Sequence, residues 1–438
     1  MMKRRDLFKT TALALFASLS TGHGATQDTK NEKVKRIPQG KNPRIVVVGG
    51  GWAGLSLAKH VKKFAPESEV TLVEKRDQFV SCPMSNEWLV DLVDLEFLTY
   101  SYIDAAVNHD YRFVHAEALE VDKKNQLLKT TQGEIAYDYL VFAVGIGYDY
   151  FEWTKGDEAL QNRLEREYPA GFMPGSEHIT IKEKIKNFKG GNFIITVPSG
   201  NYRCLAAPYE RACLIADYFK HHQIKGKVII MDESNKIRIK DKGFSTVFKE
   251  KYKDFIIYMP SSKILKFDLD KKIVETDFDE VSFEDAVFYP NIKAASILEK
   301  LNMVKKTPHN RIEADINQYT YKVKGSHNIY VCGDARPMGF SKSGNTAYSE
   351  GINVAQMIAD EIHKKTPRWQ SPVTTCFSIL STKPQTCISL YTEYEYDKNG
   401  GMLFKNSLTD EAWKTNELGS AKVAYAWAES MYHDMFYK

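Results

Sequence analysis

The chain has 438 residues, with 60 Lys and Arg against 56 Asp and Glu, and 43% of its residues are hydrophobic. This length predicts two or three domains, and the 24 Tyr and 23 Phe exclude a disordered or collagen-like chain. A net charge of +4 is too small for a nucleic-acid interface. No run of 18 apolar residues is present that would predict an ordinary membrane span.

The N-terminus has the pattern of an export signal. Basic residues open it, a short apolar run follows, and small residues lead to Ala25. The pair Arg4 and Arg5 resembles that of a twin-arginine signal. We therefore expect residues 1–25 to direct export to the periplasm and residues 26–42 to form a polar linker, with an uncleaved amphipathic anchor as the alternative. The signal holds most of the positive charge, so charge says little about partners.

A glycine-rich turn follows the first predicted strand. Residues 44–48 form a β-branched run typical of a buried parallel strand, residues 55–64 predict a helix, and residues 69–74 predict a second strand. The sequence Gly-Gly-Gly-Trp-Ala-Gly occupies residues 49–54. This order of strand, glycines, helix and strand is typical of a dinucleotide-binding unit.

The glycines and the acidic residue of this unit each have a physical role. Gly49 allows the tight turn, Gly51 lets the backbone approach a pyrophosphate, and Gly54 lets the helix pack on the strand. Glu74 ends the second strand, where its carboxylate accepts hydrogen bonds from a ribose diol and disfavours a 2′-phosphate. The residues that we assign to this half of the site are Gly49, Gly51, Trp52, Ala53, Gly54, Glu74 and Ala118.

Two later segments identify the dinucleotide. A strand within residues 137–145 ends at Gly145, and a strand from residue 328 ends at Gly333 and Asp334. Both resemble signatures of the two-dinucleotide flavoprotein superfamily, which implies that Asp334 contacts the ribityl or pyrophosphate part of FAD. A helix cap is the alternative role for Asp334.

A helix is predicted from residue 345 to residue 363. Lys342 and Ser343 precede it, and its N-terminal amides are expected to stabilise negative charge on the flavin. We therefore predict FAD as the cofactor and include Lys342 and Ser343 in its site.

The second unit lacks a nucleotide-binding loop. Its predicted strand, residues 192–197, runs into Pro198 without a G-x-G-x-x-G motif. Pro198 has no amide hydrogen for a phosphate, and Tyr202 and Arg203 place side chains where backbone would have to approach. We therefore expect no NAD(P)H binding and another source of electrons.

The segment 201–213 is the most specific in the chain. Cys204 precedes Pro208, Tyr209 and Glu210, and this arrangement resembles the flavoprotein subunit of flavocytochrome c sulfide dehydrogenases, relatives of sulfide:quinone oxidoreductases. The chain departs from that family in having Leu-Ala-Ala after Cys204, where the family has prolines. The resemblance continues in residues 81–87, 339–345, 375–380 and 425–427.

The resemblance implies the chemistry of the site. Cys204 and Cys376 match a redox pair over the flavin, and Glu210 matches a nearby carboxylate that serves as a general acid or base. Cys82 matches a cysteine that can be joined to the flavin by a thioether. In the family's scheme, sulfide opens the disulfide and leaves a persulfide, the freed thiolate reduces the flavin, and a c-type cytochrome subunit takes the electrons.

Each cysteine also has a plainer interpretation. Cys82 and Cys204 can be small buried hydrophobic residues, and Cys376 can pair with Cys387. Cys213 and Cys332 are expected to be inert core residues. The cysteine and histidine spacing predicts neither a zinc site nor haem attachment.

We predict an α/β fold with two Rossmann-like domains and a small C-terminal α+β domain. The FAD domain comprises residues 43–150 and 291–366, the second unit residues 151–290, and the C-terminal domain residues 367–438. The predicted function is oxidation of sulfide, or a related small inorganic sulfur compound, with a c-type cytochrome as partner. A sulfide:quinone oxidoreductase, or a flavin-bound sulfur-binding electron relay without turnover, is the alternative.

Overall fold

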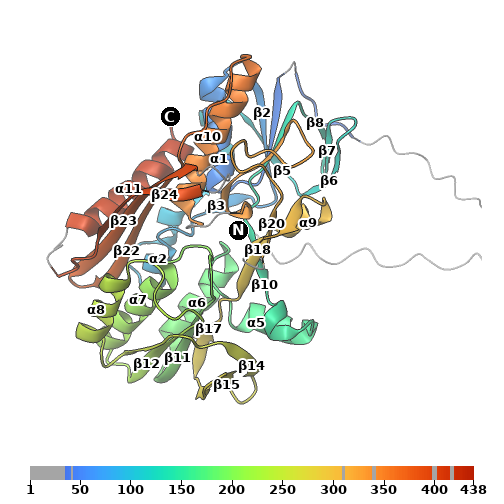
Figure 1. The fold of residues 1–438 in the computed structure, drawn as a ribbon. Coiled ribbons are helices and arrows are strands. Elements are labelled where there is room, and N and C mark those ends of the chain that lie inside the picture. Colours follow the sequence, from blue (N-terminus) through green and yellow to red (C-terminus); the bar gives the residue numbers. More distant parts are fainter. Residues whose placement is uncertain (1–34, 41–42, 308–310, 338–341, 397–401, 415–418) are drawn as a thin grey trace, which may run out of the picture. The chain divides into compact units, whose positions relative to one another are not determined.

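The computed structural model describes residues 35–40, 43–307, 311–337, 342–396, 402–414 and 419–438 (Figure 1). The predicted signal, residues 1–25, and most of the predicted linker lie outside the described residues. Residues 339–341, which belong to one of the resembling segments, also lie outside them. Among the described helices, none is long and apolar enough to cross a membrane.

A five-stranded parallel sheet forms the centre of the first region, in the order β21-β9-β1-β2-β5. Side chains of a strand alternate between its two faces. In β1 (Arg44–Val48), Ile45 and Val47 pack with the helices, while Val46 and Val48 pack with the small sheet β6-β7-β8. Because both faces are covered, the strand is apolar from Ile45 to Val48.

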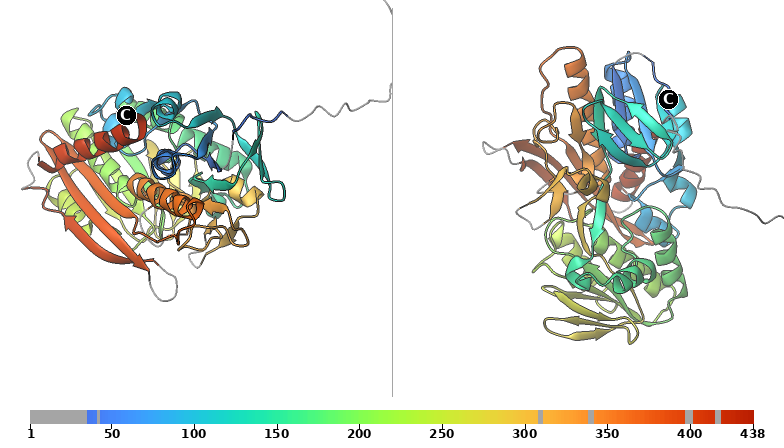
Figure 2. Two further views of the ribbon diagram at one scale, coloured as in Figure 1. Left: turned by 90° about the horizontal axis from the view of Figure 1, so that it is seen from above. Right: turned by 90° about the vertical axis from the view of Figure 1, so that its right-hand side faces the viewer.

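Two helices far apart in sequence cover one face of this sheet. α1 (Trp52–Phe64) and α10 (Gly344–Ile362) lie side by side (Figure 2). The other elements of the first region are β2 (Glu69–Glu74), β3 (Gln78–Val80), α2 (Ser85–Leu89), η1 (Leu95–Leu98), β4 (Thr99–Ser101), α3 (Tyr102–Asn108), β5 (Arg112–His115), β6 (Ala118–Asp122), β7 (Leu127–Thr130), β8 (Gly133–Ala136), β9 (Tyr139–Phe142), α9 (Ser296–Lys300), β19 (Val304–Lys306), β20 (Ile312–Ala314), β21 (Ile329–Val331) and η2 (Gly333–Ala335).

The chain passes to the second region and back through an antiparallel pair of strands, β10 (Ile146–Asp149) and β18 (Asn291–Ala294). Their positions lie next to the expected domain boundaries at residues 150 and 291. The second region contains a parallel sheet in the order β13-β12-β11-β17 and an antiparallel sheet β14-β15-β16. Its elements are α4 (Phe151–Thr154), α5 (Glu158–Glu167), α6 (Ser176–Asn187), β11 (Gly191–Val197), α7 (Ala207–His221), β12 (Gly226–Asp232), α8 (Asp241–Glu250), β13 (Ile256–Met259), β14 (Ile264–Asp268), β15 (Ile273–Thr276), β16 (Glu280–Ser282) and β17 (Asp285–Val287).

The C-terminal part is a three-stranded antiparallel sheet and a helix. The strands are β22 (Val373–Thr382), β23 (Gln385–Tyr396) and β24 (Met402–Asp410), and the helix is α11 (Gly419–Phe436). β22 contacts both α7 and α10, so this sheet closes over elements from the two other regions. The predicted α/β fold class, with Rossmann-like parallel sheets and a small C-terminal α+β part, is confirmed.

Candidate functional site

The three predicted glycine roles separate clearly in the turn between β1 and α1. A Cβ atom at Gly54 would lie 1.9 Å from the carbonyl oxygen of Gly49, so α1 can approach the turn only with glycine there. Gly49 has φ +104°, which favours glycine, and its Cβ would meet the carbonyl oxygen of Ala143 at 2.5 Å. A Cβ at Gly51 would meet nothing within 4 Å. Gly51 therefore faces open space, as a backbone that a ligand approaches should.

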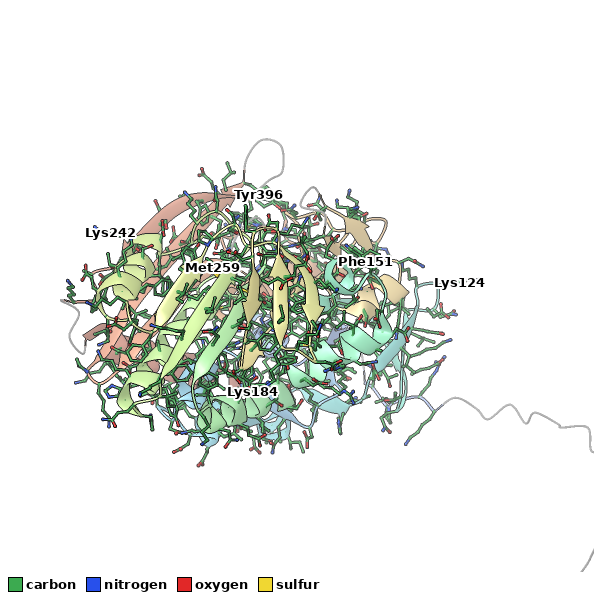
Figure 3. All side chains as sticks on the ribbon, turned by 90° about the horizontal axis from the view of Figure 1, so that it is seen from below. Lys124, Phe151, Lys184, Lys242, Met259 and Tyr396 are labelled. Atoms are coloured by element: carbon green, nitrogen blue, oxygen red, sulfur yellow. The ribbon has the colours of Figure 1, made fainter. Side chains whose placement is uncertain are left out.

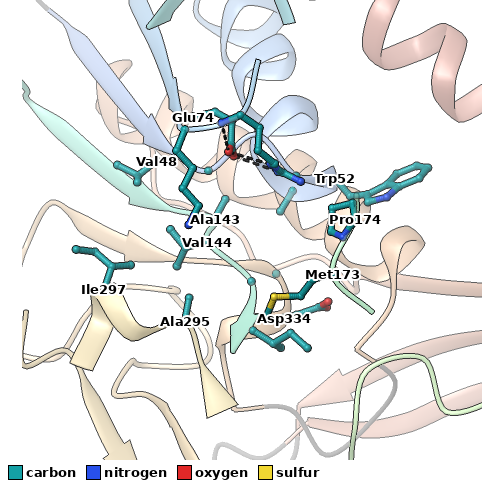
Figure 4. A pocket seen from close by; sticks show the side chains of 18 of the residues that line it. Val48, Trp52, Glu74, Ala143, Val144, Met173, Pro174, Ala295, Ile297 and Asp334 are labelled. Carbon is teal, nitrogen blue, oxygen red and sulfur yellow. Dashed lines mark hydrogen bonds and ion pairs between the residues drawn. The ribbon is translucent and has the colours of Figure 1, made fainter. Parts of the chain in front are cut away.

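That open space is a cavity of about 540 Å³ between the end of the central sheet and the β10 and β18 strands (Figure 4). Ten of the predicted cofactor residues line it. They are Gly49, Gly51, Trp52, Ala53, Glu74, Cys82, Ala118, Gly145, Gly333 and Asp334.

Glu74 is held at the end of β2 by a network of donors. Its carboxylate accepts hydrogen bonds from the amide of Gly50 at 2.7 Å and from the guanidinium of Arg76 at 3.0 Å. Burial raises the pKa of Glu74, but these donors outweigh it, and the net pKa is lowered. The carboxylate is therefore ionised and able to accept hydrogen bonds from a ribose.

Asp334 lies where β21 ends and also faces the cavity. Its carboxylate forms an ion pair with Nε of Arg203 at 3.1 Å, and Arg203 also donates to the carbonyl oxygen of Phe172 at 2.7 Å. Burial lowers the pKa of Arg203, whereas the neighbouring Cys82 and Asp334 raise it, and the net pKa is raised. Sequence reasoning placed Arg203 only as an obstacle to a phosphate and missed this pairing.

The cavity fits a flavin dinucleotide. Gly51 and Gly145 leave its wall open, since a Cβ at either position would meet no atom within 4 Å. Nε1 of Trp52 is buried at the cavity and has no hydrogen-bond partner among the described residues. A buried N–H without an acceptor is costly, so a bound ligand with an acceptor atom at this position would satisfy the indole N–H of Trp52.

Lys342 and Ser343 do not line this cavity and instead stabilise the segments around it. The ammonium of Lys342 donates to the carbonyl oxygens of Asp334 and Arg336 and forms an ion pair with Glu313 at 2.7 Å. Ser343 caps α10, because its hydroxyl accepts from the amide of Thr346. Neither residue lines the large cavity. Lys342 supports the loop that carries Asp334.

A smaller cavity of about 70 Å³ adjoins the first and shares Cys82, Arg203 and Gly344 with it. Its wall also includes Cys204, Glu210 and Cys376, which are far apart in the sequence. The three predicted catalytic residues and the predicted flavin-linking cysteine therefore border one space. All six cysteines are free thiols in this structure.

Cys204 is held in an unusual backbone conformation. Its φ is +56°, in the left-handed region that a cysteine rarely adopts, at a cost of order 1 kcal/mol. Its amide donates to the carbonyl oxygen of Lys342 at 2.6 Å, and its own carbonyl accepts from the amide of Ala207. These bonds fix Cys204 just before α7. Burial, followed by Cys376 and Glu210, raises the pKa of its thiol.

Glu210 is fixed by partners from two other elements, α2 and β22. Its carboxylate accepts from the side-chain amide of Asn86 at 2.8 Å and from the backbone amide of Ile379 at 2.7 Å. Asn86 in turn accepts from Arg211 at 3.0 Å. Burial raises the pKa of Glu210 despite these donors. This carboxyl can therefore hold or release a proton beside the cysteines.

Glu87 adds a second buried carboxyl to the wall of the small cavity. It lies on α2 beside Asn86 and is 3% exposed. Burial, together with the charge of Glu210, raises its pKa well above the usual range. Sequence reasoning missed Glu87, Asn86 and Arg211, since their roles depend on contacts between distant segments.

The strand register opposes a bond between Cys376 and Cys387. Cys376 lies opposite Leu390, whereas Cys387 lies opposite Ile379, three residues further along β22. An odd separation places the two cysteines on opposite faces of the sheet and beyond the Cα distance of a disulfide. Cys387 instead packs in a buried cluster with Ile379 and Leu214.

Two of the remaining three cysteines are buried, and the third, Cys82, is half-buried. Cys213 and Cys332 are 0% exposed within the core, and burial raises the pKa of both thiols. Cys82 lies between the two cavities, where burial raises its pKa and its thiol faces the carbonyl oxygen of Phe172 at 3.5 Å. Of these three cysteines, Cys82 alone lines the cavities.

Three family comparisons cover most of the described chain. The central region of the flavoprotein chain of flavocytochrome c sulfide dehydrogenase matches residues 179–289, and the flavin-binding region of the same family matches residues 368–436. The pyridine nucleotide-disulphide oxidoreductase family matches residues 43–168. A flavocytochrome c sulfide dehydrogenase flavoprotein chain from Chlorobaculum thiosulfatiphilum is 56% identical over 43 residues, which are 10% of this chain and 90% of that sequence. The chain belongs to the sulfide dehydrogenase and sulfide:quinone oxidoreductase-like flavoproteins.

Other members of this flavoprotein group match more of the chain at lower identity. The mitochondrial sulfide:quinone oxidoreductase of Dictyostelium discoideum is 25% identical over 385 residues, which are 82% of this chain and 81% of that protein. The structure of the sulfide:quinone oxidoreductase from Aquifex aeolicus has a TM-score of 0.66 at 15% identity and covers 90% of this chain and 92% of that one. The latter likeness supports the fold.

FAD is the cofactor of this flavoprotein. Gly51, Glu74 and Asp334 are placed to hold its pyrophosphate and ribose portions, and the wall shared by the two cavities adjoins the cysteines. When bound, the flavin supplies an acceptor for two electrons that can pass them on singly. The chain is therefore an FAD-dependent oxidoreductase whose thiols lie beside the cofactor site.

Proposed function

We propose that the chain is an exported sulfide dehydrogenase that oxidises sulfide through a Cys204–Cys376 disulfide and FAD, with a c-type cytochrome as electron acceptor. The observation that carries this proposal is the shared cavity of Cys204, Cys376 and Glu210, next to the cavity that fits FAD. Thiols from two distant segments border one small space, as a redox pair requires.

The cysteines perform the first step as a thiol–disulfide exchange. A hydrosulfide ion attacks one sulfur of the disulfide, a new sulfur–sulfur bond forms there, and the other cysteine leaves as a thiolate with the electron pair. The sulfide sulfur is oxidised, and the disulfide is reduced. The thiolate electron pair is then available to the adjacent flavin, which serves as the two-electron oxidant when bound.

Glu210 is the proton acceptor in this proposal. Asn86 and the amide of Ile379 hold its carboxylate in place, and burial raises its pKa. A base with a raised pKa retains the proton long enough to return it to a product. Glu210 therefore takes the proton that the hydrosulfide brings.

Cys82 is proposed as the covalent link to FAD. It lines both cavities and is the one residue with a nucleophilic side chain on the wall that they share, where Arg203 and Gly344 are the other two residues. A thioether at this position would keep the cofactor in place after export. Among the described residues, its thiol has one hydrogen-bond partner, the carbonyl oxygen of Phe172.

A quinone is the alternative electron acceptor. Similarity to sulfide:quinone oxidoreductases extends over 82% of the chain, which favours this alternative. The family match of residues 368–436 to the flavocytochrome c type favours the cytochrome. The two acceptors are therefore compared directly in one assay.

The test is steady-state reduction of c-type cytochrome by sulfide with purified FAD-loaded protein, beside reduction of a soluble quinone. We expect sulfide-dependent cytochrome reduction in the wild type and in Cys213→Ala, a control cysteine in the core that lines neither cavity. Cys204→Ser and Cys376→Ser should each lose it. Quinone reduction without cytochrome reduction would establish the alternative acceptor, and no turnover with either would refute the enzyme.

A further inference from the structure

Lys240 is a buried ammonium beside one of the two active-site cysteines. It lies just before α8 and is 4% exposed. Its Nζ lies 3.4 Å from the sulfur of Cys376, 3.4 Å from the carbonyl oxygen of the same residue and 2.8 Å from the hydroxyl of Ser378. The ammonium thus reaches from the second region to the C-terminal sheet and contacts the reacting sulfur.

The partners of this cation are all neutral groups or a thiol. Within the part of the chain that the structure describes, no carboxylate forms an ion pair with Lys240. A buried charge without a counterion is costly and is normally paired. The sulfur of Cys376 is the contacting group that can become an anion, so it is the natural counterion.

The backbone keeps Lys240 at this position. Its φ of +54° and ψ of +41° lie in the left-handed region, which a lysine adopts only when the surrounding structure enforces it. The two oxygens of Glu210, which borders the same cavity as Cys376, accept from Asn86 and Ile379. Among the described residues, Glu210 forms no hydrogen bond or ion pair with the ammonium, and the charge of Lys240 acts on it through space and lowers its pKa, although burial leaves the net pKa raised.

We propose that Lys240 is a catalytic residue that stabilises an anionic sulfur at Cys376 during sulfide oxidation. This inference rests on the function proposed above and deepens it. It gives the ammonium a role that neither the family resemblance nor the sequence motifs supplied.

The role holds for either direction in which the disulfide opens. If hydrosulfide attacks Cys376, the Cys204–Cys376 bond breaks, and the persulfide formed at Cys376 becomes an anion when Glu210 takes its proton. If hydrosulfide attacks Cys204 instead, Cys376 leaves as a thiolate with the electron pair. The first route places negative charge on the outer sulfur bonded to Cys376, and the second places it on the cysteine sulfur itself, which lies 3.4 Å from Nζ of Lys240. In both, the sulfide is oxidised and the disulfide is reduced.

Cys204 lies in the same small cavity but is not among the described hydrogen-bond partners of Lys240. Burial and the neighbouring Cys376 and Glu210 raise the pKa of its thiol, more than the charge of Lys240 lowers it. The direct contact of the ammonium is with the sulfur of Cys376.

The test measures the reactivity of the thiols in the reduced protein without sulfide. Iodoacetamide reacts with thiolates, and peptide mass spectrometry reports the rate at Cys376 and at Cys204 in the same sample. The variants are Lys240→Met, which removes the charge at similar volume, and Lys240→Arg, which keeps it. Lys242→Met is the matched control, because Lys242 lies exposed on α8 two residues away (Figure 3).

We expect Lys240→Met to slow alkylation of Cys376 about tenfold, with a clearly smaller change at Cys204. The alkylation rate of Cys376 in Lys240→Arg should stay within about threefold of the wild-type rate, and the rate in Lys242→Met should equal the wild-type rate. An unchanged rate at Cys376 in Lys240→Met would overturn the inference. Equal slowing at both cysteines would also overturn it, since that indicates a general structural change.

A second measurement links the lysine to turnover. In sulfide-dependent cytochrome reduction, Lys240→Met should lower kcat/KM for sulfide about tenfold, and Lys240→Arg should restore most of it. The alkylation assay uses no sulfide, so it tests the effect of Lys240 on Cys376 even if the wild type does not oxidise sulfide. Failure of the wild type with sulfide would instead refute the proposed function.

Discussion

The pair Gly51 and Gly54 allows a sharp test of where FAD binds. Both glycines belong to one turn, and each is changed to alanine in a Cys82→Ser chain, so that a thioether cannot retain the flavin. A Cβ at Gly51 meets no protein atom within 4 Å, whereas a Cβ at Gly54 would lie 1.9 Å from the backbone oxygen of Gly49. The same substitution therefore has two different physical effects three residues apart.

The magnitudes follow from those distances. Gly51 has φ −82° and ψ −169°, which alanine adopts readily, so Gly51→Ala should stabilise the apoprotein by about 0.4–1 kcal/mol through a smaller unfolded-state entropy. The new methyl group enters the space for the pyrophosphate and disturbs its amide contacts. Loss of one charge-assisted hydrogen bond costs about 1.5–3 kcal/mol, or roughly ten- to hundredfold in FAD affinity.

Gly54→Ala should behave in the opposite way. Backbone atoms cannot yield as a side chain can, so α1 must move, at a cost of about 1–3 kcal/mol in the stability of the apoprotein. Urea unfolding of the apoproteins and fluorescence titration with FAD separate the two effects. Unaltered FAD affinity in Gly51→Ala would show that the cofactor does not approach Gly51, and unaltered stability in Gly54→Ala would refute the close-packing argument.

Three further predictions concern the cofactor and the buried carboxyls. Cys82→Ser should convert acid-stable protein-bound flavin into extractable flavin, and a wild-type flavin that extracts freely would contradict the thioether. NADH should not bleach the flavin rapidly, because Pro198 and the segment after it offer no phosphate loop; rapid bleaching in stopped flow would contradict this. Burial raises the pKa of Glu87 well above its usual range. The folded state therefore loses stability as the pH rises above the pKa that the Glu87 carboxyl has in the unfolded chain. Glu87→Gln should therefore unfold at higher urea concentration than wild type at pH 8 and at nearly the same concentration below pH 4, and an equal difference at both pH values would disprove the buried acid.

The sequence was most informative where function depends on neighbouring residues. The glycines at 49, 51 and 54 and the acid at 74 follow from the local geometry of a strand, a turn and a helix. The strand at residues 44–48 and the helix beginning at Gly344 were likewise readable from local patterns, within a few residues at their ends. Such features are encoded within a single segment.

Contacts between distant segments were not readable in this way. Arg203 pairs with Asp334 across 131 positions of chain, and Lys240 reaches Cys376 across 136. No periodicity or spacing signals such a pair, because charged residues are common at both places and only the tertiary fold brings them together. The lack of a carboxylate partner for Lys240, which makes it informative, is a property of the folded site alone.

Loss of a nucleotide loop and gain of a thiol site occur in the same segment of the second region. After β11, where a phosphate loop would lie open, the chain instead turns inward, and Tyr202 is fully buried. The next residue, Arg203, reaches the carboxylate of Asp334, and Cys204 is tied through its amide to the carbonyl of Lys342. The segment in which we expect no phosphate loop thus carries a thiol to the small cavity beside the FAD site. In the proposed function, the same backbone geometry disfavours a nicotinamide cofactor and positions Cys204, so the two properties should be lost or retained together in variants of this loop.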